Sequence, residues 1–169
     1  LETNQTHRAV NGILKVLRSG PVPVTLLPRS ARTLLKTSRK ATLRIVTVPG
    51  GKYWYRGIKK SLSHVLRNLQ GPTKISLNVN IDGMSVFNSS TTQFWPMLIS
   101  IHEMPKIGPI PIAIFCGHSK PSSPMFYLSP LTRELNCLVN NGMVVNGHTL
   151  DLSVRTFICD SPARAFIKG

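Results

Sequence analysis

The segment that most restricts the fold is a strict alternation of apolar and polar residues over 74–81. Ile75, Leu77, Val79 and Ile81 occupy every second position, and Lys, Ser and Asn residues stand between them. Successive side chains of a β-strand point to opposite faces of a sheet, so this pattern predicts a strand with one buried face. We therefore expect a sheet that is built around residues 74–81.

Three more strands and two helices are predicted after this segment. Apolar patterns favour strands over 94–101, 110–115 and 149–159, a helix over 130–139 and a second helix over 163–168. Successive strands joined by short turns form an antiparallel meander, and a helical connection is long enough to return the fourth strand parallel to the first. The predicted fold class is α/β: a mixed sheet of three antiparallel strands, then a helix, a parallel strand and a helix.

Positive charge is concentrated in the first part of the chain. The chain has 21 Lys and Arg residues against 6 Asp and Glu residues, a net charge of +15. Residues 1–70 hold 14 of these bases and 1 acid (+13), whereas residues 71–169 hold 7 bases and 5 acids (+2). We therefore predict a basic extension over 1–70 and a nearly neutral folded body over 71–169. The excess charge indicates a polyanionic partner, and we favour nucleic acid over a merely soluble basic surface.

The basic extension is expected to contain short elements of its own. Helical patterns run over 5–19 and 57–69, a strand pattern runs over 43–48, and the proline-rich segment 20–40 leads to a basic turn or helix over 33–39. A tryptophan between two tyrosines, flanked by cations, suits base stacking with phosphate contact, although core packing explains it equally well. The predicted nucleic-acid contacts, two of them in the body, are Arg29, Arg32, Lys36, Arg39, Lys40, Lys52, Trp54, Arg56, Lys59, Lys60, Lys120 and Arg164.

Several classes of protein do not fit the sequence. The apolar runs, such as 110–116, are shorter than the roughly 20 residues of a membrane helix, and no secretory signal pattern follows Leu1. Because Leu1 is not a methionine, we expect a fragment or a processed chain. Cys116, Cys137 and Cys159 are odd in number and have no zinc-ligand spacing, so we expect reduced, intracellular thiols and no zinc site.

Two of the acids follow strands that are predicted to be neighbours. Asp82 comes directly after the first strand of the body, and Asp160 comes directly after the fourth. Ligands of open α/β sheets bind beyond the carboxyl ends of the strands, and paired carboxylates hold Mg²⁺ for phosphoryl transfer. The pair therefore predicts a metal site. The structural alternative is that Asp82 belongs to an Asp-Gly turn and that Asp160, before Ser161 and Pro162, caps a helix.

Four segments of the body also carry a family resemblance. They are 78–83 (NVNIDG), 89–96 (SSTTQFWP), 116–121 (CGHSKP) and 158–166 (ICDSPARAF), and the upstream strings LLKT (34–37) and GKYWY (51–55) accompany them. In this order they resemble transposase-like proteins of animal DNA transposons, a CACTA-like group of the DDE/D superfamily, over about residues 6–169.

The resemblance implies a ribonuclease-H-like core with Asp82 and Asp160 as the first two catalytic, metal-binding acids. It further implies Mg²⁺ or Mn²⁺ as cofactor and DNA, such as transposon ends, as partner. It also implies a nuclear location without membrane association, and it is compatible with a homo-oligomer. The expected activity of the intact protein is Mg²⁺-dependent DNA strand cleavage and transfer.

The chain departs from the family pattern in ways that bear on activity. The third acid of the triad and the Cys/His segment lie beyond Gly169, and Ser161 replaces an alanine. Glu134, on the predicted crossover helix, is expected to be a solvated surface residue and a poor substitute for the third acid. We therefore expect no DNA cleavage by this chain alone. The alternatives are a catalytically inactive, domesticated or decayed transposon product that binds DNA or acts as a scaffold, and a basic RNA-binding module.

Overall fold

The computed structural model describes residues 6–21, 26–35, 45–85 and 91–168. These residues fall into two units, Leu1–Leu43 and Arg44–Gly169. Among the described residues, none of the helices combines the length and the apolar character that a membrane crossing requires.

The described residues of the first unit form the helices α1 (His7–Ser19) and α2 (Ala31–Leu34). The Thr6 hydroxyl accepts a hydrogen bond from the Ala9 amide at 3.2 Å and so caps α1, which confirms the helix predicted over 5–19. The Asn11 side chain accepts a hydrogen bond from the Ala31 amide at 2.7 Å and thereby joins the two helices. Most of the basic turn predicted over 33–39 lies outside the described residues.

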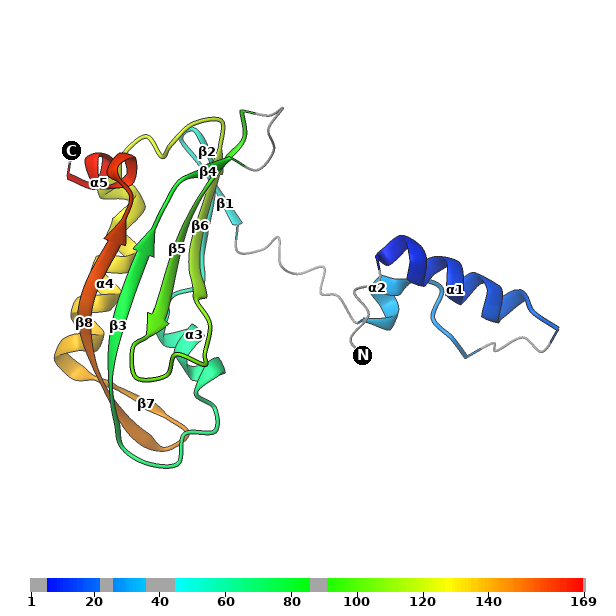
Figure 1. The fold of residues 1–169 in the computed structure, drawn as a ribbon, viewed down its shortest axis with the longest axis horizontal. Helices are drawn as coiled ribbons and strands as arrows, with labels where there is room; N and C mark the ends of the chain where they lie inside the picture. The colour runs from blue at the N-terminus through cyan, green and yellow to red at the C-terminus, as the bar shows by residue number, and fades with distance from the viewer. Residues whose placement is uncertain (1–5, 22–25, 36–44, 86–90, 169) are drawn as a thin grey trace. The chain divides into compact units, whose positions relative to one another are not determined.

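The second unit is an α/β structure around one mixed, eight-stranded sheet (Figure 1). The strand order is β1-β2-β6-β5-β3-β8-β7, and β4 pairs with β5. Strands β3, β5 and β6 pair in antiparallel fashion, and β8 lies parallel to β3 on its other side, as predicted. The strands are β1 (Ile45–Val48), β2 (Gly51–Tyr55), β3 (Thr73–Ile81), β4 (Met84–Ser85), β5 (Gln93–Ile101), β6 (Ile110–Gly117), β7 (Met143–Val145) and β8 (His148–Cys159).

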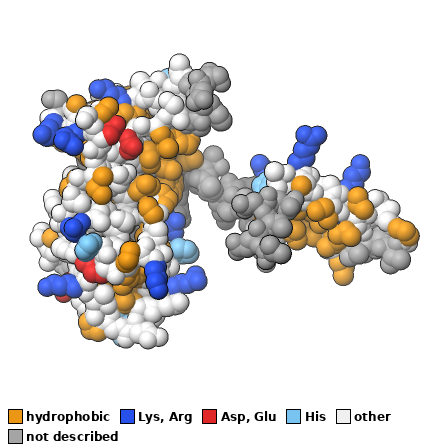
Figure 2. Space-filling model, viewed as in Figure 1, with side chains coloured by type: hydrophobic (Ala, Val, Ile, Leu, Met, Phe, Trp, Pro, Cys, Tyr) orange, Lys and Arg blue, Asp and Glu red, His pale blue; other side chains and the backbone are white. Residues whose placement is uncertain are grey.

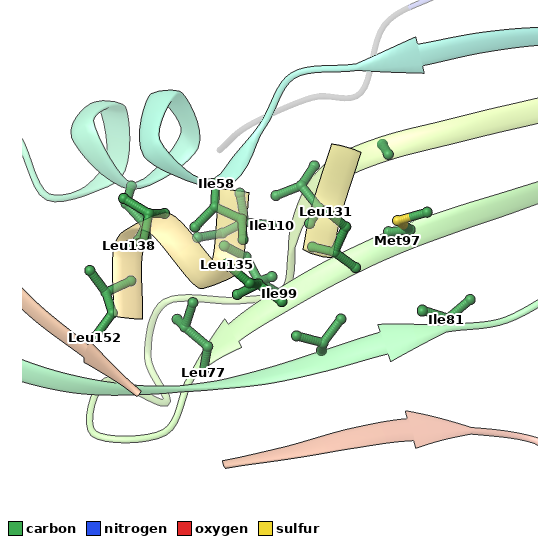
Figure 3. Packing of buried hydrophobic residues seen from close by; sticks show 14 of the residues in the cluster. Ile58, Leu77, Ile81, Met97, Ile99, Ile110, Leu131, Leu135, Leu138 and Leu152 are labelled. Carbon is green, nitrogen blue, oxygen red and sulfur yellow. The ribbon is translucent and has the colours of Figure 1, made fainter. Parts of the chain in front are cut away.

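Three helices of this unit supply the layer over the apolar face of the sheet. They are α3 (Ile58–Val65), α4 (Pro124–Asn141) and α5 (Ser161–Lys168), and their buried side chains join those of the strands in one core. The alternating apolar residues of β3 are each at most 1% exposed, which confirms the predicted buried face. In Figure 3, Leu131 and Leu135 of α4 lie against Met97 and Ile99 of β5.

The structure differs from the sequence-based expectation at three elements. Strand β2 was expected as an aromatic contact segment, β7 was not predicted, and α4 begins at Pro124 rather than at 130. Pro130 lies inside α4, where the Ser129 hydroxyl donates at 3.5 Å to the Phe126 carbonyl that the missing amide would have bonded. The expected boundary near residue 70 falls inside the second unit, since β1 and β2 extend the sheet and α3 joins the core.

Candidate metal and nucleic-acid site

The two aspartates follow adjacent strands at the same edge of the sheet. Ile81, the last residue of β3, is the register partner of Cys159, the last residue of β8. The two strands are parallel and neighbouring strands lie about 4.8 Å apart, so Asp82 and Asp160 leave the sheet side by side. The arrowheads of β3 and β8 end together in Figure 1. The register thus confirms the strand-end placement that the sequence predicted.

Asp82 is half-buried, and its position depends on the glycine that follows it. The Gly83 amide donates to Asp82 Oδ1 at 2.7 Å. A Cβ atom on Gly83 would lie 2.7 Å from the Trp95 indole ring, and Gly83 is not among the glycines with positive φ. Glycine at position 83 is therefore required for close packing against Trp95 rather than for a left-handed turn.

Asp160 is exposed and caps α5. Its Oδ1 accepts a hydrogen bond from the Ala163 amide at 2.7 Å, and its carbonyl oxygen accepts one from the Arg164 amide at 2.9 Å. This is the capping role considered from the sequence. Within the described ranges, the second carboxylate oxygen of Asp160 and that of Asp82 have no hydrogen-bond partner, so each aspartate keeps one oxygen for a ligand.

The Cys159 thiol lies within the electrostatic reach of both carboxylates. Burial is the main cause that raises the pKa of this thiol, and the negative charges of Asp160 and Asp82 raise it further. The nearby Arg164 guanidinium lowers it, and one guanidinium nitrogen lies 3.5 Å from the Cys159 carbonyl oxygen. The effect of both aspartates on one sulfur atom agrees with their placement at one point of the sheet edge.

The donor set fits a divalent cation only together with further ligands. Among the described residues, no group of three or more His, Cys, Asp or Glu side chains gathers in one place. Mg²⁺ is commonly held by one or two carboxylates plus substrate phosphates and water, so two free carboxylate oxygens suit a cation that arrives with a phosphate. A hollow of about 210 Å³ lies beside Asp160 and next to the residue that follows Asp82; its lining residues are Gly83, Met84, Ser85, Gln93, Trp95, Asp160 and Pro162.

Three of the predicted phosphate contacts lie toward this edge. Lys52 is the register partner of Cys116 on β6, one residue before the carboxyl end of that strand. Lys120 follows the same strand end, and its ammonium group lies 5.5 Å from the centre of the Phe166 ring on α5. Arg164 is one turn into α5 and exposed. These three cations are of the kind that binds phosphate.

The other predicted contacts are spread over the chain. Trp54 is half-buried in β2, next to the last residue of the strand, and its register partner on β6 is Ile114. Its neighbour Tyr53 is a core residue whose hydroxyl donates to the Tyr127 carbonyl at 3.1 Å, and burial raises the pKa of Tyr53. Arg56, Lys59 and Lys60 lie at the start of α3, Arg29 and Arg32 lie in the first unit, and Lys36, Arg39 and Lys40 lie outside the described residues.

Glu134 is not the solvated surface residue that the sequence predicted. Its carboxylate is half-buried and accepts three hydrogen bonds, from the Tyr55 hydroxyl at 2.6 Å and from the amides of Ile58 and Lys59 at 2.9 Å each. It therefore caps α3 from α4 and takes no part in the aspartate edge. Gly57 allows this close approach, because a Cβ atom there would lie 2.9 Å from the carboxylate.

Comparison of the chain with protein-family models, with curated proteins and with solved structures finds no match.

Proposed function

We propose that the second unit is the partial catalytic core of a DNA transposase-like protein with a ribonuclease-H-like fold. The proposal rests on one observation above all: Ile81 and Cys159 are register partners on parallel strands, and each is followed by an aspartate. The antiparallel order β6-β5-β3 with α4 leading to a parallel β8 supports the same fold assignment.

The described side chains supply binding and orientation at this edge. Asp82 and Asp160 would hold a divalent cation through their free oxygens, with a DNA phosphate completing the ligand set. Bound there, Mg²⁺ or Mn²⁺ would polarise the phosphate and lower the pKa of a water molecule. The Gly83 and Ala163 amides fix the orientation of the two carboxylates, and Lys52, Lys120 and Arg164 would bind flanking phosphates.

Two acids leave the site short of the triad that the family resemblance implies. We therefore expect this chain to bind a divalent cation and DNA without cutting the strand. The competing proposal is a transposon-derived binding protein that needs no metal. It is favoured by the structural partners of both carboxylates, because Asp82 accepts a hydrogen bond from the Gly83 amide and Asp160 caps α5.

Calorimetric titration of Mg²⁺ or Mn²⁺ separates the two proposals. The test compares the wild type with an Asp82→Asn, Asp160→Asn double variant, in the presence and absence of duplex DNA. Asparagine keeps the Oδ1 acceptor and caps helices as well as aspartate does, so the fold is retained while the charge is lost. Asp151→Asn, at an exposed acid on β8, controls for charge. Saturable binding that only the double variant loses supports the core; equal, metal-independent DNA binding by all three supports the binding protein.

A further inference from the structure

A second basic surface lies on α3, away from the aspartate edge. Lys59, Lys60, His64 and Arg67 are all exposed, and we call these four residues the α3 basic face. Lys60, His64 and Arg67 are separated by four and three residues, so they share one side of the helix and its final turn. In Figure 2, basic side chains lie toward both ends of the second unit, with an apolar area between them.

The cations of the α3 basic face are not neutralised by nearby acids. Within the described ranges, neither lysine nor Arg67 pairs with a carboxylate. Glu134 is the acid that contacts α3, and its oxygens are taken by the Ile58 and Lys59 amides and by the Tyr55 hydroxyl. The lysine and arginine side chains are therefore free to bind an external anion.

The helix that presents these cations is firmly held. Ile58 and Leu62 are 0% exposed and Leu66 is 5% exposed, so the opposite side of α3 is anchored in the core. The Glu134 carboxylate fixes the first turn through hydrogen bonds of 2.9 Å to two backbone amides. An anion that binds here orders only the side chains, because the backbone is already fixed, and this reduces the entropic cost of binding.

The α3 basic face is separate from the strand ends that carry the aspartates. The Arg56 amide, just before α3, donates to the Ile112 carbonyl at 2.7 Å, whereas β6 ends at Gly117. Five residues of strand correspond to about 17 Å. A ligand that contacts both regions must therefore be several nucleotides long, because a short phosphorylated molecule cannot reach both regions.

We infer that the α3 basic face binds the phosphate backbone of duplex DNA as a second contact surface. The inference rests on the proposed function, because it assumes that DNA is the polyanion. From Lys60 to Val65, its last residue, α3 rises about 7.5 Å, and Arg67 lies in the turn that follows. One strand of B-form DNA carries a phosphate for about every 3.4 Å of axis, so this face spans at least two phosphates. Lysine and arginine contacts to phosphate position the duplex and do not read its sequence.

Fluorescence anisotropy with a labelled 20-base-pair duplex, recorded over a range of salt concentrations, tests the inference. The test variant is Lys60→Ala, Arg67→Ala, and the matched control is Lys74→Ala, Arg155→Ala, which removes the same charge from exposed positions on β3 and β8. Loss of two phosphate contacts lowers the slope of log K against log salt by about 1.8, which is about a 30-fold loss of affinity at 0.15 M salt. A Lys60→Gln, Arg67→Gln variant, which keeps a polar side chain but removes the charge, gives the same loss.

The possible outcomes distinguish failure of the inference from failure of the proposed function on which it rests. A loss that is confined to the α3 variants supports the α3 basic face. An equal loss in the control shows diffuse charge attraction and overturns the inference. Wild-type affinity in the α3 variants overturns it too, but leaves DNA binding at the aspartate edge intact. Failure of the wild type to bind duplex DNA, or preference for single-stranded RNA, overturns both.

Discussion

Replacement of Glu134 is expected to be among the most destabilising changes on the described surface of α4. The carboxylate accepts hydrogen bonds from the Tyr55 hydroxyl and from the amides of Ile58 and Lys59. In Glu134→Ala all three donors lose their partner, and Ile58 is fully buried. A hydrogen bond to a charged group contributes about 1.5–3 kcal/mol, and a donor that water can reach recovers part of this. We therefore expect Glu134→Ala to lower the free energy of unfolding by about 3 kcal/mol.

The glutamine variant separates the charge from the shape of the side chain. Glu134→Gln keeps one acceptor oxygen, but places an amide NH₂ group against a donor, so we expect a loss of about 1–2 kcal/mol. Urea unfolding followed by circular dichroism measures both losses, and unchanged m-values show that the unfolded state is unaffected. In a thermal melt, Glu134→Ala should lower Tm by about 6–12 °C.

Asn136→Ala, at an exposed position two residues further along α4, is the control and should change the free energy of unfolding by less than about 0.5 kcal/mol. If Glu134→Ala matched this control, the three hydrogen bonds would have no net effect on stability. The account of α3 as a firmly held helix would then be refuted.

Three further predictions concern stability. Burial raises the pKa of Tyr127 above its ordinary value of 10, so the folded state favours the neutral phenol. The contribution of this group to the free energy of unfolding should be complete below pH 10 and decrease above it. Urea unfolding between pH 8 and pH 11 measures this decrease. Gly83→Ala should cost about 1–3 kcal/mol in a thermal melt, because its Cβ would meet the Trp95 ring, whereas Gly108→Ala, with open space around it, should cost little. Asp160→Ala should cost about 1 kcal/mol through the lost cap and Asp160→Asn much less, and equal losses would contradict the capping role.

The sheet around β3 could be predicted because its signals are local. The alternation over 74–81 determines which face is buried, and turn residues mark the strand ends. The lengths of the connections then predict the order of the strands, and with it the placement of Asp82 and Asp160. Strand β2 carries no such signal. It has five residues, three of them aromatic, and the register with β6 that makes it a strand involves residues about 60 positions away.

The role of Glu134 depends on contacts that the sequence does not reveal. Its hydrogen-bond partners lie 75–79 positions away in the chain, and nothing local distinguishes it from a solvated glutamate on a helix. The change in charge near residue 70 also lies inside the second unit. The basic residues of α3 are exposed while Ile58 and Leu62 are buried, so the charge of this segment describes its surface and the apolar residues decide where it packs.

We propose that the ends of β3 and β8 hold a divalent cation together with a DNA phosphate. Paramagnetic broadening of backbone amide signals by Mn²⁺, recorded with duplex DNA present, tests the location directly. We expect selective broadening at Gly83 and Ser161, none at Gly147 in the β7–β8 turn, and its loss in the Asp82→Asn, Asp160→Asn variant. Broadening that is centred elsewhere, or that persists unchanged in the double variant, would contradict the claim.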